Sequence, residues 1–127
     1  MSLLDSENSI ELIRGSTRVF ALLLTEDSGA PVNLTGARIL LTVKGSPSDS
    51  SVKLVKDSAR GGSPPGAEVV DALGGEARVT FFPADTHDWD PGAYVFDLWV
   101  VLASGARHPV VPQSELQVLP SITRIPL

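Results

Sequence analysis

Glycine and proline divide this sequence into short segments, and this punctuation constrains the fold more than any other feature. The 127 residues include eleven glycines and ten prolines, spread at fairly regular intervals. Such spacing is typical of short β-strands joined by turns. A parallel sheet needs crossover connections of about a dozen residues or more, usually helical, and no stretch of the chain supplies such a helix. The sequence therefore predicts strands that pair with antiparallel neighbours.

Alternation of apolar and polar residues predicts the individual strands. The third strand, Ala37–Lys44, has Ile39, Leu41 and Val43 on one face, which should be the buried face. The hairpin signal Leu73-Gly74-Gly75 lies between two further strands. The full set of predicted strands is Ser9–Ile13, Thr17–Leu24, Ala37–Lys44, Val52–Lys56, Ala67–Ala72, Glu76–Phe82, Ala93–Leu102, Arg107–Val111 and Leu116–Leu119.

Other segments predict a loop, a helical turn and a strand at the edge of a sheet. Ser58–Gly66 has no periodic apolar residue and is expected to be a mobile loop. Pro83–Trp89 is the one plausible helical piece, with Asp85 capping its first amides. Pro109 and Pro112 cannot donate to a ladder, so the last ribbon should run along a sheet edge.

Together these elements predict an all-β protein. The expected fold is an antiparallel, immunoglobulin-like β-sandwich of seven to nine strands with one short helical turn. A small closed barrel is the alternative architecture. The length predicts a single domain over residues 9–127, preceded by a flexible N-terminal segment over residues 1–8.

Charge and cysteine content exclude several classes of function. The net charge is −5, with ten basic residues scattered among fifteen acidic ones, which argues against nucleic-acid binding and against anionic membranes. There is no cysteine, so neither disulfides nor a thiolate zinc site can form. The longest apolar runs, Val19–Leu24 and Leu98–Ala103, are far shorter than a membrane span of about 20 residues. No secretory signal is expected at the N-terminus.

The acidic cluster from Asp85 to Asp90 is the one place where polar functional groups concentrate. A divalent metal held by Asp85, His87, Asp88 and Asp90 is one interpretation. A calcium loop typically carries a glycine within its turn, whereas Gly92 comes only after the last carboxylate. We therefore favour a helical corner, in which Asp85 caps and Trp89 plugs the end of the sandwich. The prediction is that this corner holds no metal and that the protein has no cofactor.

Nothing in the sequence predicts an enzyme. The Gly-x-Ser-x-Gly pattern of a nucleophile elbow is absent. Gly61-Gly62-Ser63 leads into two prolines, not into a helix whose amides could bind a phosphate.

Strand Ala93–Leu102 is unusual because it is apolar on both faces. Tyr94, Phe96, Leu98 and Val100 share the face expected in the core, whereas Val95, Trp99 and Val101 share the other with Asp97. A strand of an antiparallel sandwich normally has one face exposed to solvent. The apolar side chains on the second face of this strand therefore need to be covered by another part of the protein. The terminal ribbon or Ser58–Gly66 could supply this cover. Otherwise Val95, Trp99 and Val101 form an exposed interface, and a homo-oligomer is expected.

Two further expectations concern this region. Asp97 is expected to pair with Arg38 or Arg78 on a neighbouring strand, or to face solvent. If Trp89, Tyr94 and Trp99 were exposed together, they could form a platform on which a sugar stacks. This makes a carbohydrate- or ligand-binding module the alternative function.

Several segments, taken in order, resemble one family. They are Ile13–Thr17, Gly29–Ala37, Asp85-Thr86 followed by Pro91–Asp97, Leu116–Val118, and Ile122–Arg124. These resemble the "rGdt", "dG.p.dLtGa", "dT…pG.Y.yD" and "vTR" patterns of immunoglobulin-like domains in tailed-phage structural proteins. The N-terminal domain of the baseplate upper protein is the best-known example. The chain departs from the family at Ser114-Glu115, where a glycine is usual.

The resemblance implies a function. It suggests a non-enzymatic structural or assembly protein of a tailed phage or prophage, a component of the head, tail or baseplate that acts through protein–protein contacts. Its expected partners are other virion or tail proteins, or copies of itself. The expected location is the virion, after synthesis in the bacterial cytoplasm.

Overall fold

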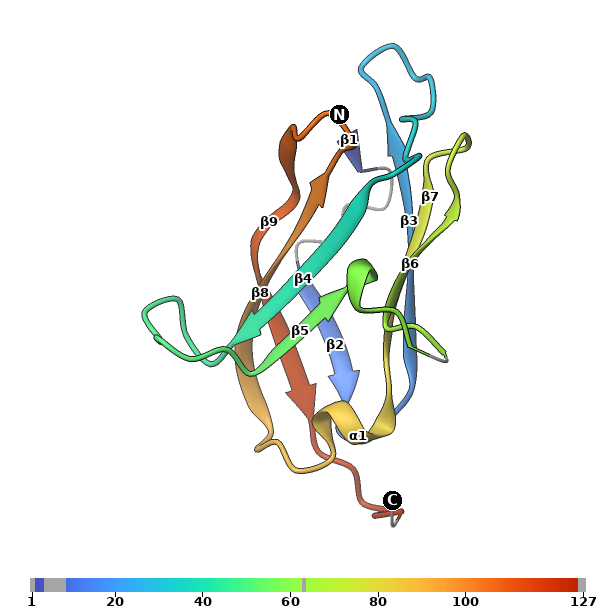
Figure 1. Cartoon of the computed structure of the whole chain (residues 1–127). Helices are drawn as coiled ribbons and strands as arrows, with labels where there is room; N and C mark the ends of the chain where they lie inside the picture. Colours follow the sequence, from blue (N-terminus) through green and yellow to red (C-terminus); the bar gives the residue numbers. More distant parts are fainter. Residues whose placement is uncertain (1, 4–8, 63, 126–127) are drawn as a thin grey trace.

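The computed structural model describes residues 2–3, 9–62 and 64–125, and these fold into two β-sheets packed face to face (Figure 1). One sheet contains β1 (Ser2–Leu3), β3 (Arg18–Thr25), β7 (Glu76–Phe81) and β6 (Ala67–Asp71). The other contains β2 (Ser9–Ile13), β9 (Arg107–Leu119), β8 (Gly92–Val101), β4 (Arg38–Lys44) and β5 (Leu54–Asp57). The prediction of an all-β sandwich is confirmed.

The order of the strands makes this sandwich immunoglobulin-like. The four-stranded sheet has the order β1-β3-β7-β6 and the five-stranded sheet the order β2-β9-β8-β4-β5. The first order matches the A-B-E-D sheet of immunoglobulin domains. In the second, β9-β8-β4 matches the G-F-C sheet, and β2 and β5 extend it by one strand at each edge. One detail differs from the expectation of a wholly antiparallel fold, because β2 pairs in parallel with β9.

The predicted alternation holds in β4 and β8, two inner strands of the five-stranded sheet. Ile39, Leu41 and Val43 of β4 are all buried, and so are the even-numbered residues from Tyr94 to Val100 of β8. From the other sheet, Phe81 and Leu24 reach the same core and are also buried. The apolar side chains of both inner faces thus form one core between the sheets.

The last strand differs most from its predicted form. The two predicted strands Arg107–Val111 and Leu116–Leu119 are one strand, β9, whose register against β8 shifts near Leu98. Its first half, which contains both prolines, pairs with β8 alone and lies at the edge, as predicted. Its second half is not at the edge, because residues 115–119 also pair with β2.

The helical corner is shorter than predicted. Helix α1 spans Pro83–Thr86, a single turn, and a 3-10 turn, Ser58–Arg60, begins the segment predicted as a loop. The described part of the chain contains no helix with the length and apolarity that a membrane crossing requires. The predicted flexible segment over residues 1–8 lies mostly outside the described residues, although Ser2–Leu3 pairs with β3.

The two ends of the sandwich carry different features (Figure 1). The β3–β4 connection, the β6–β7 hairpin and the β8–β9 turn lie at one end. Helix α1, the β2–β3 turn and the C-terminal segment lie at the other.

Candidate interaction surface

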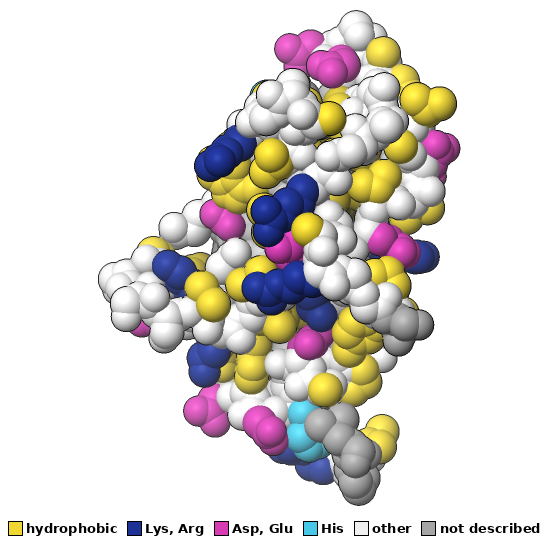
Figure 2. Space-filling view, in the orientation of Figure 1, with side chains coloured by type: hydrophobic (Ala, Val, Ile, Leu, Met, Phe, Trp, Pro, Cys, Tyr) yellow, Lys and Arg dark blue, Asp and Glu magenta, His cyan; other side chains and the backbone are white. Residues whose placement is uncertain are grey.

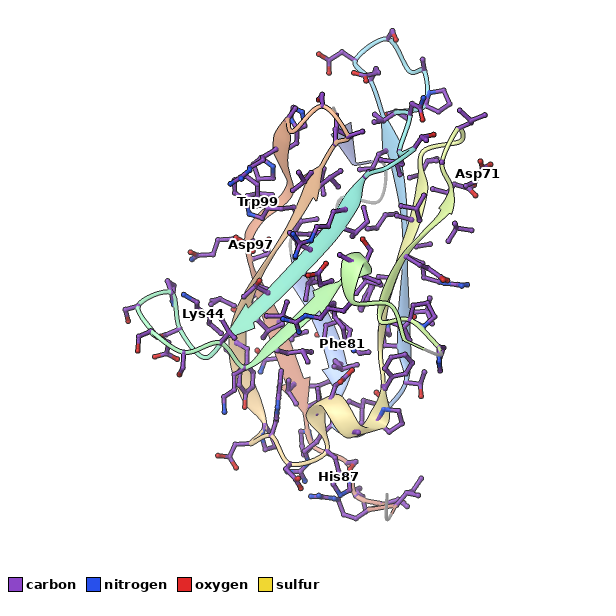
Figure 3. The ribbon with its side chains drawn as sticks, viewed as in Figure 1. Lys44, Asp71, Phe81, His87, Asp97 and Trp99 are labelled. Atoms are coloured by element: carbon purple, nitrogen blue, oxygen red, sulfur yellow. The ribbon has the colours of Figure 1, made fainter. Side chains whose placement is uncertain are left out.

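The three predicted interface residues all lie on the outer face of the five-stranded sheet. Trp99 is 36% exposed, and Val95 and Val101 are half-buried. Asp97 and Trp99 point away from the four-stranded sheet (Figure 3). Of the two predicted covers, the terminal ribbon does not lie over them, because β9 lies beside β8 in the same sheet. The other begins with the turn Ser58–Arg60, which contacts β4 and β6.

The strand register joins Trp99 to apolar residues of both neighbouring strands. Leu40 of β4 lies opposite Trp99 on one side, and Pro109 of β9 lies opposite it on the other. Pro109 is exposed and Leu40 is half-buried. We call the outer face around Leu40, Trp99, Pro109, Val95 and Val101 the Trp99 face. Sequence reasoning missed Leu40 and Pro109, because only the register between strands shows that they flank Trp99.

Charged residues border the Trp99 face. Val101 lies opposite Arg38 on β4 and Arg107 on β9, both exposed. Val95 lies between Lys44 and Glu115. An aromatic centre with a charged rim that includes arginine is the usual composition of a protein–protein interface.

Asp97 has a different partner from the one predicted. Its carboxylate accepts a hydrogen bond from the indole Nε1–H of Trp99, with 3.0 Å between Nε1 and Oδ2. The predicted ion pairs do not form, because Thr42 stands opposite Asp97 and Arg78 belongs to the other sheet. Since the two side chains are two residues apart on one face, Asp97 satisfies the indole donor and fixes the orientation of the ring.

Arg38 instead pairs with Asp57 of β5. Its Nε and Nη2 donate to the two carboxylate oxygens of Asp57 at 2.9 and 2.6 Å. This bidentate hydrogen bonding lowers the pKa of Asp57 below its ordinary value, although burial acts in the opposite direction. The same contact raises the pKa of Arg38. The pair holds β5 against β4 at the border of the Trp99 face.

A small hollow adjoins this face at its other border. Its volume is about 200 Å³, and its lining includes Thr42, Lys44, Pro47, Val95 and Gln113. Pro47 belongs to the β4–β5 loop, which projects from the side of the molecule (Figure 1). The apolar face is thus continuous with a shallow depression that offers both an ammonium and an amide group.

The acidic corner does not gather its four candidate ligands. Asp85 forms an ion pair with Lys56, 2.6 Å from Nζ, and accepts a hydrogen bond from the Phe82 amide at 2.7 Å. Asp88 and Asp90 are exposed. Within the described ranges, no group of three or more His, Asp or Glu residues could hold a metal ion. The absence of metal binding stays a prediction.

The capping role proposed for Asp85 is partly wrong. Phe82, not Asp85, occupies the N-cap of α1, and Asp85 reaches back from the first turn to the Phe82 amide. Lys56, which was predicted as an ordinary strand residue, is buried beside it and lies 4.6 Å from the centre of the Phe82 ring. Sequence reasoning missed this pair, because β5 and α1 meet only in the folded chain.

The three aromatic residues are not exposed together, so the sugar platform does not form. Tyr94 is buried, and its ring lies 4.9 Å from the half-buried ring of Trp89. Trp99 projects from the opposite face of β8.

The Tyr94 hydroxyl donates to the Asp90 carbonyl oxygen at 2.6 Å, which is the contact of the tyrosine corner of immunoglobulin domains. Burial and the nearby Asp90 raise the pKa of Tyr94. Trp89 therefore packs at the end of the sandwich, as predicted.

The other sheet also exposes apolar side chains that sequence reasoning did not single out. On its outer face, Val19 is 52% exposed and Val70 is 53% exposed. A hollow of about 620 Å³ lies beside Val70, lined in part by Ala21, Leu23 and Arg78. Arg78 forms an ion pair with Glu68 there. This face has no exposed aromatic residue among the described residues.

No protein-family model matches the chain, and no curated protein matches it either. Among solved structures, that of murine CRIg is similar, with 14% sequence identity and a TM-score of 0.44. The match covers 94% of this chain and 97% of that chain. The class of the protein, an immunoglobulin-like β-sandwich, follows from its own strand order.

Proposed function

We propose that this protein is a non-enzymatic assembly module that binds a protein partner through the Trp99 face. The observation that carries the proposal is the exposed indole of Trp99, held in place by Asp97 and flanked by Leu40 and Pro109. Tryptophan in such a setting is a typical energetic centre of an interface. A side chain that is already oriented loses less entropy on binding, which favours association.

The histidines and the acidic corner form no catalytic arrangement in the described part of the chain, which is consistent with this proposal. Among the described residues, neither histidine ring forms a hydrogen bond to a serine or a carboxylate. Asp85, which lies in α1 itself, is engaged by Lys56. That the protein is not an enzyme nevertheless stays a prediction.

The more specific proposal is that the assembly is the particle of a tailed phage or prophage, with other virion or tail proteins as partners. It is supported by the sequence resemblance. Segments that carry the resemblance meet at one end of the sandwich: the Gly15 amide donates to Thr86 Oγ1 at 2.9 Å, and Arg124 donates to the His87 carbonyl oxygen at 3.1 Å. Three of these motifs thus pack at one corner, whereas Gly29–Ala37 lies in the β3–β4 connection at the other end.

Genomic context and particle composition test this proposal. We expect the gene to lie among portal, capsid or tail genes, and the chain to be present in purified particles by mass spectrometry. A gene outside any phage cluster, or particles that lack the chain, would contradict the phage proposal.

Variants test the role of the face itself. A strain lacking the gene would be complemented with the wild type, with Trp99→Glu, or with Val19→Glu as a matched control on the other sheet. Because a charge at the centre of an interface is costly to bury, Trp99→Glu should not be incorporated into particles, whereas Val19→Glu should be. Equal incorporation of both variants would mean that the Trp99 face is not the docking surface.

A further inference from the structure

A small hollow at the α1 end of the sandwich gathers positive charge in an otherwise acidic protein. It has a volume of about 180 Å³ and lies between the β2–β3 turn, the residue after α1, and the C-terminal segment. Arg14, His87 and Arg124 line it, together with the hydroxyl residues Ser121 and Thr123. No Asp or Glu is among its lining residues. The chain as a whole carries a net charge of −5, so the charge at this hollow is opposite in sign to that of the whole protein.

The folded backbone brings the two arginines to this hollow from distant parts of the chain. Arg14 is half-buried in the β2–β3 turn, and its Nη1 donates to the Trp89 carbonyl oxygen at 3.3 Å. Arg124, exposed in the C-terminal segment, is fixed by its hydrogen bond to the His87 carbonyl oxygen. Figure 3 shows His87 between α1 and the C-terminal segment. Both guanidinium groups are therefore held in place by backbone oxygens.

One donor in this arrangement has no acceptor. The Nε atom of Arg14 is buried and has no hydrogen-bond partner among the described residues. A buried donor left unpaired is costly, and such groups in folded proteins usually find a partner in a water molecule or an ion. The guanidinium group carries five N–H donors and no acceptor, so its missing partner must be an acceptor.

We propose that this hollow is an oxyanion site, which binds a phosphate or carboxylate group between Arg14 and Arg124. The planar fork of arginine matches the paired oxygens of both groups. The volume is below the roughly 300 Å³ at which sites for drug-sized ligands begin, so it suits a single small anionic group. The site lies on a different part of the molecule from the Trp99 face and does not depend on it.

A titration followed by nuclear magnetic resonance tests the proposal. Nitrogen-15-labelled protein would be titrated separately with sodium phosphate, sodium acetate and sodium chloride at one pH and one ionic strength. We expect saturable shifts of the Arg14 Nε–H and Gly15 amide signals with phosphate and acetate, and none with chloride. Saturation with phosphate alone would assign the site to phosphate groups. The absence of saturation with both oxyanions, or identical shifts with chloride, would overturn the proposal.

Two variants make the test specific. Arg124→Gln removes an exposed guanidinium, so the fold should be kept while oxyanion affinity falls by about tenfold. Arg107→Gln is the matched control, because it removes an exposed arginine at the opposite end of the sandwich and should leave affinity unchanged. Wild-type affinity in Arg124→Gln, or equal losses in both variants, would contradict the proposal. Trp99→Glu should bind phosphate normally, so failure of this site and failure of the docking proposal can be told apart.

Discussion

The ion pair between Arg38 and Asp57 joins the edge strand β5 to β4 in the five-stranded sheet. Asp57 is buried, and both of its carboxylate oxygens accept from Arg38 while the Ala59 amide donates to Oδ1. A carboxylate with these donors is stabilised in its charged form. Arg38 itself is exposed, so screening by solvent limits the strength of the pair.

The first prediction concerns the titration of Asp57. The pKa of Asp57 in the folded protein should lie below the unfolded value of about 3.9. Its contribution to stability is therefore present above that unfolded value and is lost as the pH falls through the folded pKa. In Arg38→Gln the largest cause of the lowering is absent, so the carboxyl should titrate at a higher pH. Carboxyl chemical shifts followed across pH 2–6 would measure both midpoints. Identical midpoints in the two proteins would show that Arg38 does not set this pKa.

At the scale of elements, the β6–β7 hairpin depends on a glycine in a conformation that other residues rarely adopt. Gly75 has φ +70°, and a Cβ atom there would lie 2.4 Å from the carbonyl oxygen of Leu24 on β3. The hairpin also connects to β3 through the Leu24 amide, which donates to the Gly75 carbonyl oxygen at 2.9 Å. The turn and the neighbouring strand are thus packed backbone to backbone.

The second prediction follows from that contact. Gly75→Ala should lower the free energy of unfolding by about 2 kcal/mol or more, because the positive φ costs about 1 kcal/mol and the clash with backbone adds to it. Gly29→Ala is the matched control: Gly29 has φ +90° but nothing within 4 Å of the added Cβ. It should lose only the conformational part, about 1 kcal/mol. Chemical denaturation of the three proteins would measure this difference, and equal losses would contradict it.

The α1 corner supports a third prediction. Because Lys56 engages Asp85, and Asp88 and Asp90 are exposed without a third ligand close by, this corner should bind no metal tightly. A ligand that binds the folded state selectively must raise stability, so thermal melts with calcium, zinc or EDTA should superimpose. A metal-dependent rise in melting temperature that disappears in Asp88→Ala would contradict this prediction.

The sequence predicted features that depend on neighbouring residues, but not those that depend on contacts between distant parts of the chain. The alternation around Ile39 and Tyr94 predicted which residues are buried, because a strand's side chains alternate whatever its partners are. The ion pairs predicted for Asp97 do not form, although it does lie on the outer face, the other predicted alternative. Strand register and sheet membership are not visible in a single sequence. For the same reason the sequence did not predict that Leu40 and Pro109 flank Trp99. Nor did it predict that Arg14 and Arg124 line one hollow.

The whole molecule presents its charged and apolar groups unevenly. In Figure 2, lysines and arginines gather over the middle of the five-stranded sheet, while acidic residues are more numerous at the ends. Arg38, Lys44 and Arg107 border the Trp99 face, and Asp97 and Glu115 lie on the same face. A surface that carries both signs around an apolar centre can meet a second copy of itself in the antiparallel arrangement of a two-fold dimer.

The last prediction is that the protein self-associates through this face. A two-fold contact would place Trp99 of one chain against Leu40 and Pro109 of another and bring basic and acidic border residues together. Light scattering over a concentration series should show the mean mass rising with concentration. Trp99→Glu should restore the monomer, because its charge would be buried unpaired, whereas Val19→Glu on the other sheet should associate as the wild type does. A monomer at every concentration would contradict self-association. Association that survives Trp99→Glu but not Val19→Glu would place the interface on the four-stranded sheet.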